Sequence, residues 1–218
     1  SSLDCVGIFA RGPRILRDVL TRLALPVDAP LDSLPAIGFI FAAQPDIDAL
    51  LVDALEALGI AANSVTLPLL GEVHRAGLTI INRENWLAFN TLLASHAVSP
   101  DVASRIQAGE SITSDQLASA ENVRAQFTAQ VNALLEDTPL LALATLPELP
   151  PTLEEAEDPL SVVNLTRLVR PFTLSGHPAI SLPMGELQGR PVALQLVAGF
   201  GEEGLLVQAA EWLMLHRL

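Results

Sequence analysis

The feature that most constrains the fold is a strand–helix–strand pattern over residues 36–67. Residues 36–41 predict a strand, and residues 45–58 predict a helix with proline in its first turn and Gly59 beyond its end. Residues 60–67 predict a second strand. Because the apolar residues of the helix recur at the helical period without a gap, one face of the helix should be buried. This order of elements predicts two parallel strands with the helix packed across them.

The other elements extend this sheet and cover it. We expect helices over residues 13–25, 72–96, 100–108, 113–135 and 202–216, and a short buried strand over residues 140–144. Residues 158–197 predict a helix, a proline-bounded loop and two strands, 179–182 and 192–197, with Gly185 and Gly189 in the turn between them. The predicted fold class is therefore α/β, with a mixed, largely parallel sheet flanked by helices.

Composition excludes several classes of function. The 218-residue chain carries a formal net charge of −13, which disfavours nucleic acid as a partner because phosphate contacts need clustered Lys and Arg. No apolar run approaches the roughly 18 residues that a membrane helix needs, so we expect no membrane partner. Cys5 is the single cysteine, which excludes an internal disulfide and a cysteine metal cluster. The chain does not open on a signal-peptide pattern, which favours a cytoplasmic protein.

Two segments carry a resemblance to a known family. Residues 171–197 and residues 2–11 contain Gly, Pro, Ser and Thr at fixed spacings. The matching residues are Thr173, Gly176, Pro178, Ala179, Ser181, Pro183, Gly189, Pro191, Val192, Gln195, Leu196 and Val197, and, near the start, Ser2, Leu3, Asp4, Gly7, Ala10 and Arg11. In order and spacing they resemble the amidase signature family of Ser–Ser–Lys amide hydrolases. The resemblance covers residues 1–218, which would form the C-terminal portion of a single amidase-like domain that lacks its N-terminal part.

The resemblance implies hydrolysis of a carboxamide C–N bond through a Ser acyl-enzyme. The family's catalytic Ser, second Ser and Lys would belong to an N-terminal segment absent from this chain, so no catalytic residue is expected within it. All 12 basic residues here are arginine, and the chain alone has neither the catalytic Lys nor the Gly/Ser-rich nucleophile loop. Whether it is an enzyme by itself stays open. The alternative is a catalytically inactive amidase-like remnant or an α/β binding or assembly module.

The resemblance also implies partners. The expected ones are a small-molecule amide substrate and either the missing N-terminal half or a second copy of the chain. No cofactor is implied. No metal is expected either, because His74, His96 and His216 lie on predicted helices without a partner at ligand spacing.

Arg124 is the most informative single side chain. It lies inside the apolar stripe of its predicted helix, four residues after Ala120 and three before Phe127. A guanidinium directed toward a core needs an anion or carbonyl partner. One interpretation is a structural ion pair, with Glu84 or the acids of residues 154–158. The other, implied by the family's glutamine-using members, is a clamp for a substrate carboxylate.

Other candidate substrate-binding residues are Thr145, Thr173, Ser175 and His177. Ser175 and His177 could form a nucleophile–base pair, but packing beside the pocket is the favoured interpretation, because so short a spacing rarely gives the required geometry. Amidotransferase members of the family have an Asp that recognises the substrate amino group, and the matching position here is Thr166. The missing acid argues against glutamine as a substrate and against a tRNA amidotransferase role.

Overall fold

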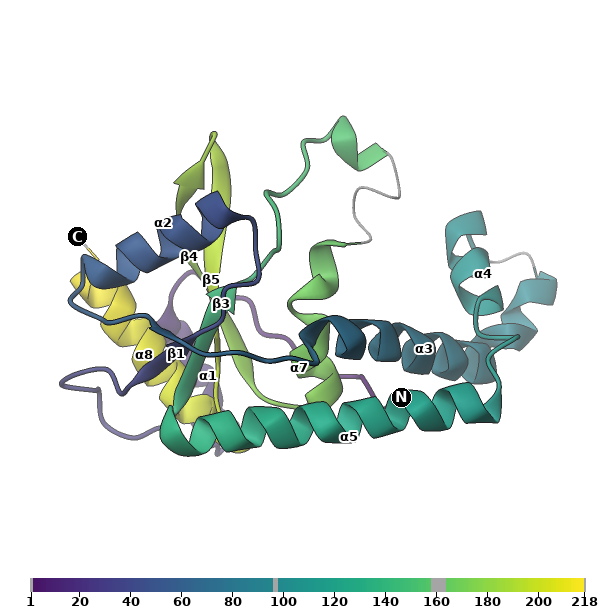
Figure 1. Cartoon of the computed structure of the whole chain (residues 1–218), viewed down its shortest axis with the longest axis horizontal. Coiled ribbons are helices and arrows are strands. Elements are labelled where there is room, and N and C mark those ends of the chain that lie inside the picture. The colour runs from purple at the N-terminus through teal and green to yellow at the C-terminus, as the bar shows by residue number, and fades with distance from the viewer. Residues whose placement is uncertain (1, 96–97, 158–163, 218) are drawn as a thin grey trace.

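The computed structural model describes residues 2–95, 98–157 and 164–217, and the strands of this part form one five-stranded sheet (Figure 1). The strand order is β2-β1-β3-β5-β4. The strands are β1 (Ile37–Phe39), β2 (Asn63–Ser64), β3 (Leu140–Ala144), β4 (Ala179–Leu187) and β5 (Arg190–Val197). All five residues of β3 are buried, so the middle strand lies at the centre of the core.

The predicted parallel unit is confirmed. Strand β1 pairs in parallel with β2, and α2 (Pro45–Glu56) connects them. The second strand is much shorter than the expected residues 60–67, and β1 is shorter than residues 36–41. One further bond, from the Val65 N–H to the Phe39 carbonyl, continues the pairing. Since β1 offers only three residues to its neighbours, the longer apolar run after α2 has no strand partner along most of its length.

The other side of the sheet is antiparallel. Strands β4 and β5 form the predicted hairpin, and their turn consists of Gln188 and Gly189, which both have positive φ. The expectation that Gly185 lies in this turn is wrong. Gly185 belongs to β4 beside an irregularity in the register, and a Cβ there would lie 3.0 Å from Leu50 of α2. Glycine at this position therefore allows the strand to approach the helix closely.

The mixed α/β sheet is confirmed, with one difference in proportion. Strand β3 pairs in parallel with β1 and antiparallel with β5. Among the described strands, two pairings are parallel and two are antiparallel, and the antiparallel ladders are the longer ones, so the sheet is mixed but not largely parallel.

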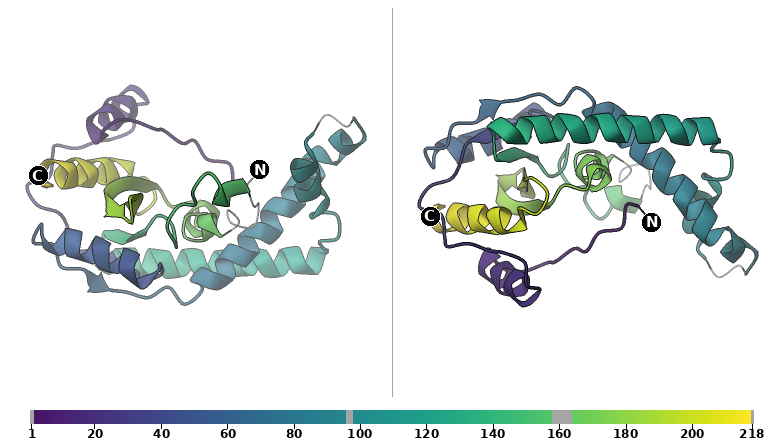
Figure 2. Two further views of the ribbon diagram at one scale, coloured as in Figure 1. Left: turned by 90° about the horizontal axis from the view of Figure 1, so that it is seen from above. Right: turned by 90° about the horizontal axis from the view of Figure 1, so that it is seen from below.

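Helices surround the sheet and also extend beyond it. The remaining helices are α1 (Pro13–Arg22), α3 (Leu70–Phe89), α4 (Pro100–Gln107), α5 (Ser114–Asp137), α7 (Arg170–Ser175) and α8 (Glu203–His216), with 3-10 segments η1 (Asn90–Ser95), η2 (Glu155–Glu157) and η3 (Leu165–Arg167). Helix α2 packs across β3, β4 and β5, whereas α3 and α5 lie side by side and run past the sheet (Figure 1). Helix α8 packs against β4, and α1 lies on the outside of α8 (Figure 2).

Several helix predictions need correction. The helix expected over residues 72–96 ends at Phe89, where the Asn90 side chain donates to the Trp86 carbonyl at 2.6 Å, and the chain continues as η1. In residues 158–175 the first part of the expected helix lies outside the described residues. The expected proline-bounded loop contains α7, because Pro171 occupies the first turn of a helix, where proline is tolerated.

The helix expected over residues 13–25 ends at Arg22, and Ala24 then has a positive φ.

The long helix α5 begins with the predicted capping box. The Thr113 hydroxyl accepts from the Gln116 N–H, and the Gln116 side chain accepts from the Thr113 N–H. Within the described residues, no helix is long and apolar enough to span a membrane.

Candidate functional site

Ser2, in the motif near the start of the chain, is held between the two long helices. Both carboxylate oxygens of Glu84, on α3, accept from the Ser2 backbone N–H at 3.0 and 3.1 Å. From α5, Arg124 donates through Nη1 to the Ser2 hydroxyl at 3.1 Å and through Nη2 to the Ser2 carbonyl at 3.2 Å. Two side chains from different helices therefore fix the position of one residue.

Arg124 also connects this residue to α7. Its Nε donates to the Leu174 carbonyl at 2.7 Å, and its Nη1 lies 3.6 Å from a Glu121 carboxylate oxygen. All three guanidinium nitrogens thus have acceptors within the chain. Glu121 supplies a carboxylate within ion-pair distance, where the sequence analysis expected Glu84 or the acids of residues 154–158. The side chain is 24% exposed, so part of it faces solvent. Binding of a substrate carboxylate by Arg124 stays a prediction.

Ser175 and His177 are hydrogen-bonded despite their short spacing. Gly176, with φ of 81°, lies between them and ends α7. The His177 Nδ1 lies 2.9 Å from the Ser175 hydroxyl, and its Nε2 lies 2.9 Å from the amide oxygen of Asn132 on α5. Because that oxygen only accepts, a neutral His177 ring carries its proton on Nε2, and Nδ1 faces the Ser175 hydroxyl. The same hydroxyl lies 3.3 Å from the Phe172 carbonyl oxygen, to which it also can donate.

This arrangement has the chemical elements of a nucleophile–base pair, but it is enclosed. Ser175 is 7% exposed and His177 is 5% exposed, and the Phe200 ring stacks on the imidazole with ring centres 4.3 Å apart. Burial lowers the pKa of His177 from 6.5 to about 4, so the ring is neutral at pH 7. A neutral, covered imidazole fits the packing role that the sequence favours.

Asn132 is a functional candidate that the sequence analysis missed. It follows Arg124 by eight residues on α5, with Thr128 halfway between them, so the three share one face of the helix. The Thr128 hydroxyl donates to the Arg124 carbonyl at 2.9 Å. This four-residue spacing of polar side chains was the available signal, but it does not reveal which distant segment the polar face meets.

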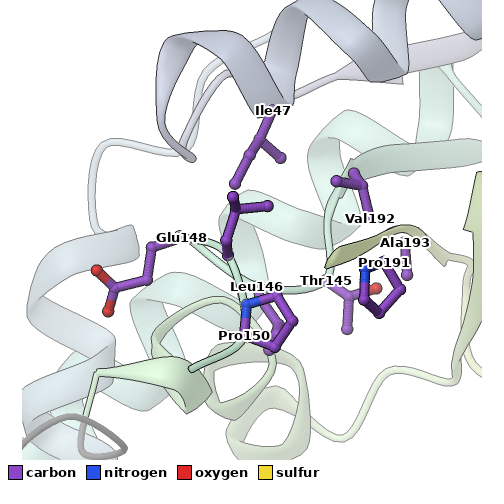
Figure 3. A pocket seen from close by; sticks show the side chains of 9 residues that line it. Ile47, Thr145, Leu146, Glu148, Pro150, Pro191, Val192 and Ala193 are labelled. Carbon is purple, nitrogen blue, oxygen red and sulfur yellow. The ribbon is translucent and has the colours of Figure 1, made fainter. Parts of the chain in front are cut away.

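The two threonine candidates lie in different surroundings. The Thr173 hydroxyl donates to the Val169 carbonyl within its own segment at 3.4 Å. The Thr145 hydroxyl lies 2.7 Å from that of Ser181, and Thr145 lines a cavity of about 230 Å³ (Figure 3). That cavity is mostly apolar, with Ile47 from α2 facing Pro191 and its neighbours at the start of β5. The structure therefore groups Arg124, Ser175 and His177 around α7 and places Thr145 in a separate cavity.

A second hollow lies at the carboxyl ends of β1 and β3. From β1 the chain proceeds through α2 to β2 on one side of β1, while β3 lies on the other side, so the direction of the connections changes between β1 and β3. Open α/β sheets bind ligands in the crevice at such a topological switch point. The hollow measures about 220 Å³. Its lining residues are Ala43, Gln44, Pro147, Glu148, Asn164 and Arg167. Within the described part of the chain, no group of three or more His, Cys, Asp or Glu side chains could hold a metal.

Comparison with known proteins gives one consistent result. The family model described as Amidase matches residues 41–207. A glutamyl-tRNA(Gln) amidotransferase subunit of Methanothermobacter thermautotrophicus is 33% identical over 114 residues, which cover 50% of this chain and 25% of the relative. Amidase 1 of Oryza sativa subsp. japonica is 31% identical over 133 residues, which cover 60% of this chain and 30% of the relative.

Solved structures agree in fold. A crystal structure of an amidase aligns with a TM-score of 0.79 at 22% identity, covering 94% of this chain and 51% of that chain. At this identity the likeness concerns the fold. The chain thus spans about half the length of the solved amidase, and smaller shares of the curated relatives are aligned with it.

Proposed function

Because the chain belongs to the amidase family, we propose that it forms the C-terminal half of an enzyme that hydrolyses a carboxamide through a Ser acyl-enzyme. The observation that carries the proposal is the family match over residues 41–207, which includes α5, α7 and the hairpin. The amidase-like fold supports it.

The catalytic Ser, second Ser and Lys belong to a segment outside this sequence. The composition supports this, because all 12 basic residues are arginine and a lysine base has to come from elsewhere. The role of this chain is then positional. Glu84 and Arg124 fix Ser2, and Arg124 ties Ser2 to the end of α7, so the residues that precede Ser2 would enter the site from a defined point.

The substrate is a carboxamide other than glutamine. Thr166 occupies the position where the resemblance expects an acid for an amino group, and its hydroxyl accepts from Arg170 Nη2 at 2.7 Å. A guanidinium at this place repels an ammonium group. The net charge of −13 also disfavours a tRNA partner. Relatives named as tRNA amidotransferase subunits are therefore similar in fold and family, and we expect a different substrate.

The protein partner is the N-terminal half of the amidase domain. Val6 is 91% exposed and Phe9 is fully exposed, although both side chains are apolar. Covering them would stabilise the assembly through burial of apolar surface. Self-association of the chain is the alternative, and sedimentation velocity of the 218-residue chain over a range of concentrations distinguishes a monomer from a dimer. Cytoplasmic location stays a prediction, to be checked by cell fractionation.

The decisive experiment compares two proteins on a panel of carboxamides. One is the 218-residue chain, and the other is the same chain joined to the residues that precede it in its gene. We expect hydrolysis by the joined protein alone, with inhibition by a Ser-directed reagent. In the joined protein Arg124→Met should reduce kcat, while Arg105→Met on the exposed side of α4 serves as the matched control. A folded joined protein that cleaves no amide would mean an inactive remnant or a binding module.

A further inference from the structure

Basic side chains from two segments gather beside η3 and α7. Arg75 belongs to α3, and Arg167 and Arg170 belong to η3 and α7. The pKa of His74 is lowered, first by burial and then by the positive charges of these three arginines. All three charges therefore influence the same imidazole. Within a chain of net charge −13, three cations around one buried imidazole form an unusual local excess of positive charge.

Arg170 is built into the fold. Its aliphatic stem lies against α3 at Gly77, where a Cβ would lie 3.0 Å from the Arg170 Cδ and 3.1 Å from its Cγ. This close approach brings the guanidinium to His74, one turn earlier on α3, with Nη1 at 3.3 Å from both ring nitrogens. Burial lowers the pKa of Arg170. The side chain is thus partly desolvated and held by packing.

The groups that Arg170 meets in these contacts are neutral. They are the His74 ring and the Thr166 hydroxyl, which accepts from Nη2 at 2.7 Å. A half-buried guanidinium with neutral acceptors retains the cost of desolvation, and an anion offsets that cost. The Thr166 O–H remains able to donate to the same anion, because its oxygen is the acceptor in the bond with Arg170.

Space for a ligand adjoins the cluster. The hollow of about 220 Å³ at the ends of β1 and β3 is lined by Asn164 and Arg167. Glu148, in the segment that follows β3, also lines this hollow. Figure 3 shows its carboxylate pointing away from the apolar cavity that Thr145 lines. Glu148 and Arg167 both line this hollow, so one acid offsets part of the positive charge that Arg167 brings to it, while Arg170 contributes from beside the hollow through its contact with Thr166.

We propose that Arg170, Arg167 and Thr166 bind a small oxyanion, a carboxylate or a phosphate, at the edge of this hollow. A planar guanidinium matches both groups through paired N–H donors. This site rests on the proposed function in one respect, because Thr166 is also the position that the resemblance assigns to substrate recognition, although its contacts involve none of Arg124, Ser175 and His177.

The test uses the 218-residue chain and two probes, inorganic phosphate and succinate. Each is titrated by calorimetry and by thermal unfolding at constant ionic strength, with chloride as the balancing anion. We expect saturable binding and a rise in Tm with at least one probe. Succinate alone would identify a carboxylate site, and phosphate alone a phosphate site. Because no hydrolysis is measured, failure here leaves the proposed amidase function standing.

Variants separate a site from general charge effects. Arg170→Gln should weaken probe binding about tenfold or more, because it removes a charged donor. Arg105→Gln, which removes one exposed positive charge on α4, should leave it unchanged. Glu148→Gln should strengthen binding. Without a probe, Arg170→Gln should be no less stable than the wild type, since a desolvated charge is gone.

Two results would overturn the proposal. Equal losses of affinity in Arg170→Gln and Arg105→Gln would mean that the anions respond to overall charge. No saturable binding of either probe would mean that no oxyanion site exists here, and a lower Tm for probe-free Arg170→Gln would then mean that Arg170 joins α3 to α7 as a structural residue only.

Discussion

Removal of the enclosed imidazole His177 should change how stability depends on pH. The pKa of His177 lies at about 4 in the folded protein, against 6.5 for the unperturbed group, and burial is the cause. Between these two values the unfolded chain binds more protons than the folded chain. The contribution of His177 to the free energy of unfolding is therefore fully present above pH 6.5 and is lost as the pH falls toward 4.

The size of the effect follows from the same two values. Each pH unit between them corresponds to about 1.4 kcal/mol, so the contribution of His177 lost between pH 7 and pH 4 is about 2 to 3 kcal/mol. His177→Gln cannot take up this proton. Its stability at pH 7 should fall because the contacts with Ser175 and Asn132 change, but its further loss toward pH 4 should be smaller than that of the wild type by this amount.

Urea unfolding at pH 7, 5.5 and 4.5 measures the difference. Other groups with shifted pKa values, such as Asp48 (raised by burial) and His74 (lowered by burial), are present in both proteins and cancel. Gln195→Met is a suitable control, because Gln195 is equally buried but does not titrate, so its effect should be the same at each pH. If the wild type and His177→Gln lose stability in parallel, His177 is not enclosed as the structure describes, and the reasoning fails.

Two further predictions concern the packing of α8. Arg17 and Glu211 join α1 to α8 through an ion pair at 2.6 Å. Arg17→Met should therefore reduce the free energy of unfolding by about 1 to 2 kcal/mol. A double-mutant cycle with Glu211→Gln that shows no coupling would contradict this. Gly204→Ala should cost about 1 to 3 kcal/mol, because its Cβ would lie 2.4 Å from the Pro26 carbonyl oxygen. In urea unfolding, Gly71→Ala should cost nothing by comparison, since no atom lies within 4 Å of a Cβ there.

The candidate site was predictable in part. The position of Arg124 within an apolar stripe indicated a guanidinium with an internal partner, and the structure supplies acceptors for all three of its nitrogens. The partners themselves, Ser2 and the Leu174 carbonyl, lie 122 and 50 residues away. No local pattern encodes such distances, and this also explains why Asn132 was missed.

The sequence alone determined what short-range physics controls. Apolar periodicity set α2 and the strand before it, a capping box set the start of α5, and Gly189 set the turn of the hairpin. These features depend on neighbours within a few residues, so they can be read without knowledge of the fold.

Tertiary structure decided the rest. It placed β3 between β1 and β5, which joined a parallel part of the sheet to an antiparallel part and created the switch point with its hollow. It used Gly185 for contact with α2 in place of a turn, and it brought Arg170 against His74 across Gly77. The physical reason is common to all three: burial and close packing join residues that are distant in sequence, and the choice among distant partners is made by the folded chain as a whole.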